Sequence, residues 1–240
     1  MIHIKKKMKY ILYLDSLQST GARASASVFH LNQQILNAMQ VKVLAFTFGN
    51  TLHNIVAGSN TLIFDTVTVT VPPANYTFAE LLTYLNTTLM ANVAFAAKMV
   101  ALQALQLDTE NNVLWTIGSN ILQGGTLLSG FGITETKTGS FQSFLYLARP
   151  SSIAISCNAF HGGNDRFVTT KDNSIRNVFY VGQIQSGFGE EEPPNYDYQF
   201  TTQLSRSNLS QIELSIFNPC DSRELTELTH FSLTLELLTL

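Results

Sequence analysis

A strand that runs directly into a capped helix, in residues 60–90, is the feature of this chain that most constrains its fold. Polar and apolar residues alternate over residues 65–71, the period expected of a half-buried strand. The Pro-Pro pair that follows ends the strand, because a proline ring cannot donate a backbone hydrogen bond. Thr77 and Glu80 then have the spacing of a capping box, which predicts that a helix begins there. Four leucines share one face of this helix: Leu81, Leu82, Leu85 and Leu89.

The rest of the chain is rich in short strands separated by turn residues. The clearest alternation lies in residues 230–237, and residues 211–216 show the same period. Residues 94–107 fit both helix and strand, and we favour a strand for residues 100–107 because a turn-like Asp-Thr-Glu-Asn-Asn sequence follows. The other predicted strands cover residues 28–35, 41–48, 61–64, 113–117, 152–156 and 177–181. Eight or more strands with one clear helix predict an all-β chain that folds as an antiparallel β-sandwich.

The first 27 residues are predicted to form an extended N-terminal arm, and residues 28–240 a single domain. Residues 16–27 are rich in Ser, Ala, Gly and Thr, as expected of an extended segment. The apolar run of residues 10–14 is too short for a signal peptide, so we interpret the start as a soluble terminus. A basic arm that contacts an anionic partner is the alternative. Four lysines would supply its charge: Lys5, Lys6, Lys7 and Lys9.

Charged residues make up only 13% of the chain, against about 25% in typical soluble proteins. Two situations favour such depletion: coverage of the surface by neighbouring subunits, or a β-rich module whose polar surface is mainly Ser, Thr, Asn and Gln. The net charge of −3 argues against nucleic-acid binding by the chain as a whole, leaving only the lysine cluster for such contact. No apolar run approaches 18 residues, so no membrane span is predicted.

No pattern in the sequence predicts a catalytic, metal or cofactor site. The five histidines show no ligand spacing. Residues 161–165, His-Gly-Gly-Asn-Asp, are similar to an esterase oxyanion loop, but the required Gly-x-Ser-x-Gly elbow is missing. The glycine-rich residues 124–132 lack the spacing of a phosphate-binding loop. We therefore expect no enzyme activity, no substrate and no cofactor.

The loop around residues 188–200 is the main candidate for a binding surface. Aromatic residues in loops are typical interface anchors, and the alternative is that they plug one end of the sandwich core. The three consecutive glutamates 190–192 lack calcium-loop spacing, so we interpret them as a solvated or partner-facing segment. With the four lysines, the predicted assembly surface contains Phe188, Glu190, Tyr196 and Tyr198.

Several segments, taken in order, resemble a known family. They are residues 26–31 with 41–44, 50–55 with 60–64, 69–72 with 75–82 and 85–86, 126–131, 212–217 and 231–237. In this order they resemble the single jelly-roll penton and minor capsid proteins of the double-stranded DNA virus lineage that includes large eukaryotic viruses, virophages and polinton-like elements. Two stretches depart from the family pattern: residues 218–221, where an Asp-Gly type turn is usual, and residues 94–107.

The resemblance implies a single jelly-roll β-sandwich with one connecting α-helix. It further implies a structural capsid protein of the virion, assembled in the host cytoplasm or nucleus. The expected role is a penton subunit at five-fold vertices, forming a homopentamer in contact with the major capsid protein and other minor capsid proteins. The basic arm would then face inward or thread beneath neighbouring subunits. The alternatives are a minor capsid or cement protein and a lectin-like, receptor-binding sandwich.

Overall fold

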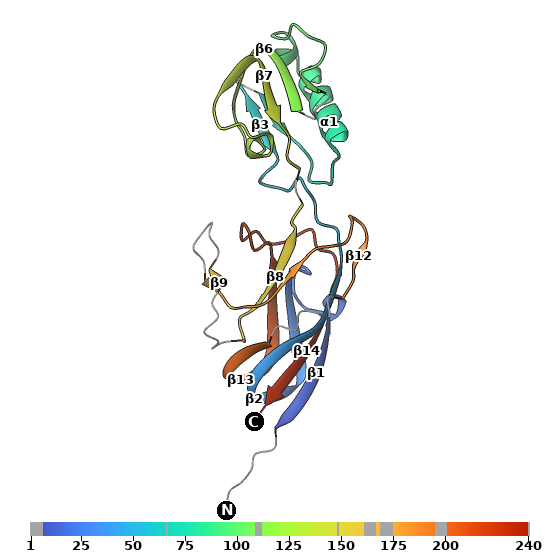
Figure 1. Cartoon of the computed structure of the whole chain (residues 1–240), viewed down its shortest axis with the longest axis vertical. Helices are drawn as coiled ribbons and strands as arrows, with labels where there is room; N and C mark the ends of the chain where they lie inside the picture. The colour runs from blue at the N-terminus through green and yellow to red at the C-terminus, as the bar shows by residue number, and fades with distance from the viewer. Residues whose placement is uncertain are drawn as a thin grey trace, which may run out of the picture. The chain divides into compact units, whose positions relative to one another are not determined.

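The computed structural model describes residues 7–65, 67–108, 112–147, 149–160, 167–168, 175–194 and 201–239 (Figure 1). The chain divides into two compact units, Met1–Leu52 with Pro150–Leu240, and His53–Arg149. Each unit has its own cluster of buried apolar side chains. The structure therefore differs from the expected single domain of residues 28–240. The physical reason is that the apolar faces of the central segment pack against one another and form a core of their own.

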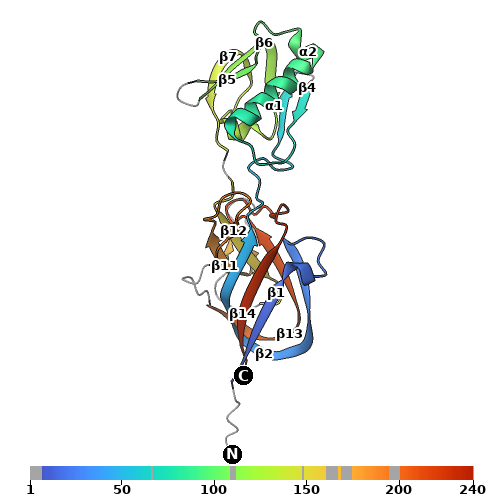
Figure 2. The same ribbon diagram turned by 90° about the vertical axis from the view of Figure 1, so that its right-hand side faces the viewer.

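The first unit is built on one curled antiparallel sheet (Figure 2). Its strand order is β1-β14-β2-β13-β8-β11, and β12 pairs with the end of β2. The strands are β1 (Met8–Asp15), β2 (Ala26–Gly49), β8 (Ser152–Cys157), β11 (Val178–Gln183), β12 (Glu191–Glu192), β13 (Thr201–Phe217) and β14 (Phe231–Thr239). A separate pair joins β9 (Phe167–Val168) to β10 (Ile175–Arg176), and a short 3₁₀ turn, η1 (Ser16–Gln18), follows β1.

The long strand β2 organises this sheet. The second half of β2, from Ala38 to Phe48, pairs with β14. The other edge of β2 pairs with β13 along most of the length of β2. Register shifts interrupt both ladders, and Asn37 has a φ of +52°. Such bulges bend a strand and increase its twist, which accounts for the curl. The alternation predicted for the last strand is confirmed, since four side chains of β14 are fully buried: Phe231, Leu233, Leu235 and Leu237.

The N-terminal segment also differs from the expected arm. Residues 8–15 form β1, which pairs with β14 along its whole length, from Met8–Thr239 to Asp15–Ser232. The next turn is fixed by a hydrogen bond of 2.9 Å from the backbone N–H of Phe231 to Ser16 Oγ. The alternating side chains of Tyr10, Leu12 and Leu14 face the core of the unit, which explains why this short apolar run folds as a strand.

The second unit combines a small sheet with the predicted helix. Its strand order is β4-β3-β6-β5, with β7 also paired to β6. The elements are β3 (Thr61–Phe64), β4 (Val67–Thr70), α1 (Phe78–Ala91), α2 (Val93–Ala96), β5 (Leu105–Leu107), β6 (Asn112–Gly124), the 3₁₀ turn η2 (Leu128–Phe131) and β7 (Lys137–Phe144). The leucine face of α1 is buried in the same core as Phe64 and Trp115.

The capping box predicted at the start of α1 is present. Thr77 donates its backbone N–H to Glu80 Oε2 at 2.8 Å, and Glu80 donates its backbone N–H to Thr77 Oγ1 at 3.3 Å. Residues 94–107, which fit both helix and strand, contain some of each: α2 ends at Ala96, and the strand β5 is limited to Leu105–Leu107. Asn86 of α1 fixes β5, since its amide donates to the carbonyl of Leu105 and accepts N–H groups from Ala104 and Leu105.

We expect Thr77→Ala to lower the free energy of unfolding of the second unit by about 1 kcal/mol, because two N–H groups at the start of α1 lose their capping geometry. Urea unfolding followed by circular dichroism measures the change. Thr77→Ser, which keeps the hydroxyl, is the matched control and should stay close to the unaltered protein. An equal loss in both variants would contradict a role for the cap.

The predicted fold class is confirmed: the chain is an all-β antiparallel jelly-roll protein with one main connecting helix. That helix lies in the second unit, in the connection between β4 and β5. Within the described residues, none of the helices is long and apolar enough to cross a membrane.

Candidate assembly surface

The two described lysines of the basic cluster lie at the start of β1. Lys7 is exposed immediately before the strand. Lys9 is exposed on β1, and its Nζ lies 2.9 Å from Glu236 Oε2 on the neighbouring strand β14. An exposed ion pair of this kind contributes little to stability, but it neutralises part of the predicted basic charge. Lys5 and Lys6 lie outside the described residues.

One buried carboxylate, that of Glu192, fixes the backbone beside the acidic loop that contains Glu190 and Glu191. Glu192 is 6% exposed. Its two oxygens accept the backbone N–H of Gln185 at 3.0 Å, and one of them accepts the N–H of Ser186 at 2.8 Å. Burial raises the pKa of Tyr180, and the charge of Glu192 raises it further. Glu190 and Glu191 are exposed, so the three consecutive glutamates do not form one solvated cluster.

Of the loop residues in the predicted assembly surface, the structure describes Phe188 and Glu190. Phe188 is 44% exposed, and its role at an interface stays a prediction. Glu190 accepts the N–H of Gly187 on its Oε2 at 2.6 Å, and its carbonyl accepts the N–H of Asn50 at 2.8 Å. Tyr196 and Tyr198 lie outside the described residues.

The fold does not bring Lys9 close to the acidic residues of β12. Lys9 is opposite Leu238, which is opposite Gln40 of β2, whereas Glu191 is opposite Gly49. Nine residues of strand separate these two positions on β2, about 30 Å at the usual rise. Lys9 and the strand β12 therefore lie near opposite ends of the ladder between β14 and β2.

An apolar edge strand is the surface that sequence reasoning missed. Ile11 is 55% exposed and Tyr13 is 63% exposed, both on the outer side of β1. Within the described part of the chain, β1 pairs only with β14, so its second edge has no partner strand. An exposed apolar edge strand readily pairs with another chain. The signal in the sequence is the short apolar run of residues 10–14, which is long enough for a strand although it is too short for a signal peptide.

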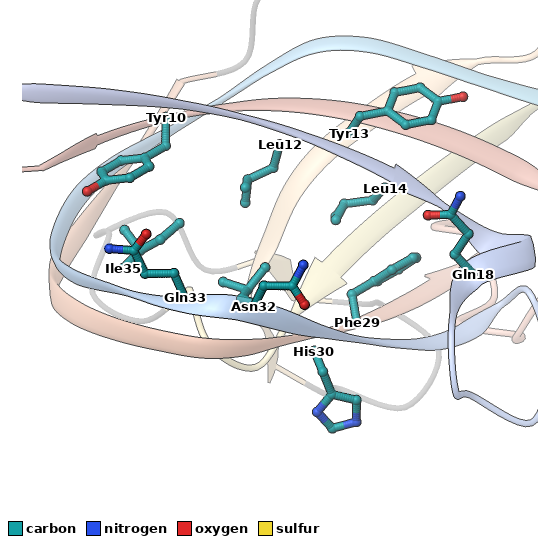
Figure 3. Close-up of a pocket in the computed structure, with 11 residues that line it drawn as sticks. Tyr10, Leu12, Tyr13, Leu14, Gln18, Phe29, His30, Asn32, Gln33 and Ile35 are labelled. Atoms are coloured by element: carbon teal, nitrogen blue, oxygen red, sulfur yellow. The ribbon is translucent and has the colours of Figure 1, made fainter.

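A groove lies beside this strand, between β1 and the first half of β2 (Figure 3). Its volume is about 380 Å³. In Figure 3, Tyr10, Leu12 and Leu14 point from β1 toward β2, and Phe29 points back toward them, whereas Tyr13 and His30 point away. The remaining lining residues are Gln18, Leu31, Asn32, Gln33 and Ile35. The groove thus has an apolar interior and a neutral polar rim.

The β2 side of the groove is irregular. On β13, Gln211 is opposite His30 and Leu209 is opposite Ile35, so residues 31–34 of β2 bulge against a single residue of β13. Across the described strands, none pairs with the other edge of β2 between His30 and Asn37. Backbone groups that find no partner in the protein must bind water or another chain. The groove therefore separates two strand edges that are both available for pairing.

Among the described residues, no three His, Cys, Asp or Glu side chains lie close enough together to hold a metal ion. The two cysteines are both free, Cys157 buried and Cys220 exposed. Burial raises the pKa of the Cys157 thiol to about 11. Because the thiolate is the reactive form, the two thiols should differ strongly in reactivity.

We therefore expect Ellman's reagent to titrate one thiol per chain, Cys220, in the native protein at about pH 8, and both thiols after unfolding in strong denaturant. Cys220→Ser is the control, and it should leave no rapidly reacting thiol in the native state. Rapid reaction of Cys157 in that variant would contradict its burial in the first core.

Comparison with known proteins found solved structures that are similar to this chain. The alignment covers 98% of this chain and 99% of the crystal structure of the selenomethionine-labelled mavirus penton protein, with 11% sequence identity and a TM-score of 0.46. Similarity at this level assigns no function to the chain. No protein-family model and no curated protein sequence matches it.

Proposed function

We propose that this chain is a structural subunit of a viral capsid, and that it occupies five-fold vertices as a homopentamer. The observation that carries the proposal is the edge strand β1, which presents Ile11 and Tyr13 to solvent beside an open groove. A chain that functioned as a monomer would be exposed to aggregation at such an edge. A neighbouring subunit that covers β1 removes this hazard.

The composition and the sequence resemblance support the same proposal. Charged residues make up only 13% of the chain, and charge is depleted at the centre of protein interfaces. In a ring, one surface of each subunit meets a different surface of the next. The edge of β1 supplies an apolar surface for such a contact. In this proposal the chain is found in the virion, contacts the major capsid protein and other minor capsid proteins, and has no catalytic role.

The mass of the purified full chain tests the self-association. We expect a species of about 130 kDa, corresponding to five chains of 26.5 kDa, in sedimentation velocity and in mass photometry. Ile11→Asp should dissociate it while leaving the circular dichroism spectrum unchanged, because a charge buried at an interface without a partner is costly. Val93→Asp, at an exposed apolar position of α2 in the second unit, is the matched control.

Imaging of intact particles tests the position in the capsid. Density for this chain at the five-fold vertices would support the penton role. Density between the major capsid subunits would favour a minor capsid or cement protein instead. A chain that stays monomeric at all concentrations and is absent from particles would overturn the proposal.

A further inference from the structure

We infer that the groove between β1 and β2 binds residues 1–6 of a neighbouring copy of this chain as an added β-strand. The inference rests on the proposed assembly function and names one of its contacts. It follows from four properties of the groove and the segment: the free strand edges, the side-chain pattern, the length and the direction of the chain.

The free strand edges favour an extended occupant. The second edge of β1 has no partner among the described strands, and neither does the edge of β2 from His30 to Asn37. An extended segment placed beside such an edge forms main-chain hydrogen bonds, and its alternate side chains enter the neighbouring pocket. A helix or a compact loop would leave the same N–H and C=O groups unpaired.

The side-chain pattern of the first residues matches the groove. The sequence Met-Ile-His-Ile-Lys-Lys alternates, so Ile2 and Ile4 would lie on one face of a strand, with His3 on the other. The groove presents Leu12, Leu14 and Leu31 to such an apolar face. Its rim is polar and uncharged, with Gln18, Asn32 and Gln33. The lysines that follow Ile4 can extend from the rim into water.

The length of the segment also fits. The part of β1 that lines the groove runs from Tyr10 to Leu14, a span of roughly 17 Å at the usual strand rise. Six extended residues span about 20 Å. Residues 1–6 are therefore long enough to follow the groove from one end to the other.

The direction of the chain indicates a neighbouring copy rather than the same one. Met8 is already fixed opposite Thr239 of β14, so residues before it leave β1 at the Tyr10 end of the groove. To enter their own groove they would have to reverse within Lys5, Lys6 and Lys7. The first eight residues contain no Gly, Pro, Asn, Asp or Ser, the residues that favour tight turns. The groove of a neighbouring copy would accept the segment without such a reversal.

Cross-linking between two differently tagged chains tests the contact. Both chains carry Cys220→Ser, one carries Ile4→Cys and the other Leu31→Cys, and they are mixed, reassembled and oxidised. We expect a disulfide-linked dimer that contains both tags. The matched control replaces Leu31→Cys with Thr83→Cys, at an exposed position of α1 in the second unit, and should give less than about one tenth of that dimer, since a disulfide needs two Cα atoms within 7 Å.

Two substitutions, each adding one negative charge, test whether the segment contributes to the stability of the oligomer. Ile4→Asp should raise the concentration at which the oligomer half-dissociates by about tenfold or more, because it places a carboxylate in the apolar groove. His3→Asp adds the same charge on the opposite face of the strand and should change that concentration much less.

Each other outcome contradicts the inference in a distinguishable way. An intact oligomer with no cross-link, and with Ile4→Asp equal to His3→Asp, would leave the capsid proposal standing and exclude the arm from the groove. A third chain that carries both Ile4→Cys and Leu31→Cys tests the alternative: an internal disulfide in that chain, without the mixed dimer, would show that the segment binds the groove of its own chain. A monomeric unaltered chain would overturn both proposals.

Discussion

Trp115→Ala is expected to lower the free energy of unfolding of the second unit by about 3–5 kcal/mol. Trp115 is 1% exposed and lies at the centre of an aromatic cluster. Its ring is stacked on Phe141 with centroids 5.4 Å apart, and it meets the edge of Phe131 at 5.0 Å. Its Nε1–H donates to Ser143 Oγ at 2.8 Å. Alanine removes these contacts together and leaves a cavity between β6, β7 and η2.

Urea unfolding followed by far-ultraviolet circular dichroism measures this loss, and amide hydrogen exchange locates it. Protection should fall in β3, β6 and α1 and persist in β2, β13 and β14, because the two units have separate cores. Leu114→Ala, on the next residue of the same strand and 39% exposed, is the control and should cost less than about 1 kcal/mol. A uniform loss of protection in both units would contradict the separation of the cores.

Local patterns were sufficient to predict the elements that depend on neighbours in sequence. The strand before Pro72, the capping box of Thr77 and Glu80 and the leucine face of α1 are all present. The buried alternation of β14 is present too. Hydrophobic periodicity, helix caps and strand-ending prolines each depend on residues that are close in sequence. A single segment therefore contains the information needed to predict such an element.

The division into two units could not be predicted in that way. It depends on which apolar faces meet, for example the leucines of α1 with Phe64 rather than with Phe231, and these choices join residues far apart in sequence. The same limit applies to β1. Its five apolar residues form a strand because β14 provides a complete partner, and nothing within the first 27 residues specifies that partner.

Residue type alone does not determine where the residues of the predicted assembly surface lie in the sheet. Lys9 and Glu190 both carry charge, yet strand pairing places Lys9 and β12, which follows Glu190, near opposite ends of the ladder between β14 and β2. Ile11 and Tyr13 carry no charge and lie outside the predicted loop, yet both are exposed on the edge strand β1. An interface is defined by which edges remain unpaired after folding, and that is a property of the whole sheet.

The second large loss of stability is expected from substitution of Glu192, which fixes the loop that contains Phe188. We expect Glu192→Ala to lower the free energy of unfolding of the first unit by about 2–4 kcal/mol, because hydrogen bonds to a buried charged group are strong and the N–H donors are left without it. Those donors are the backbone groups of Gln185 and Ser186. The pairing of β12 with Phe48 and Gly49 should weaken as well.

Thermal and urea unfolding, with limited proteolysis of residues 184–192, measure the consequence. Glu191→Ala is the matched control, since Glu191 is exposed on the same two-residue strand, and it should change stability by less than about 0.5 kcal/mol. Glu192→Gln keeps the shape and one acceptor oxygen, so it should fall between the two. Equal stability of Glu192→Ala and Glu191→Ala would show that the buried carboxylate does not hold the loop. In that case the exposed position of Phe188 would need another support.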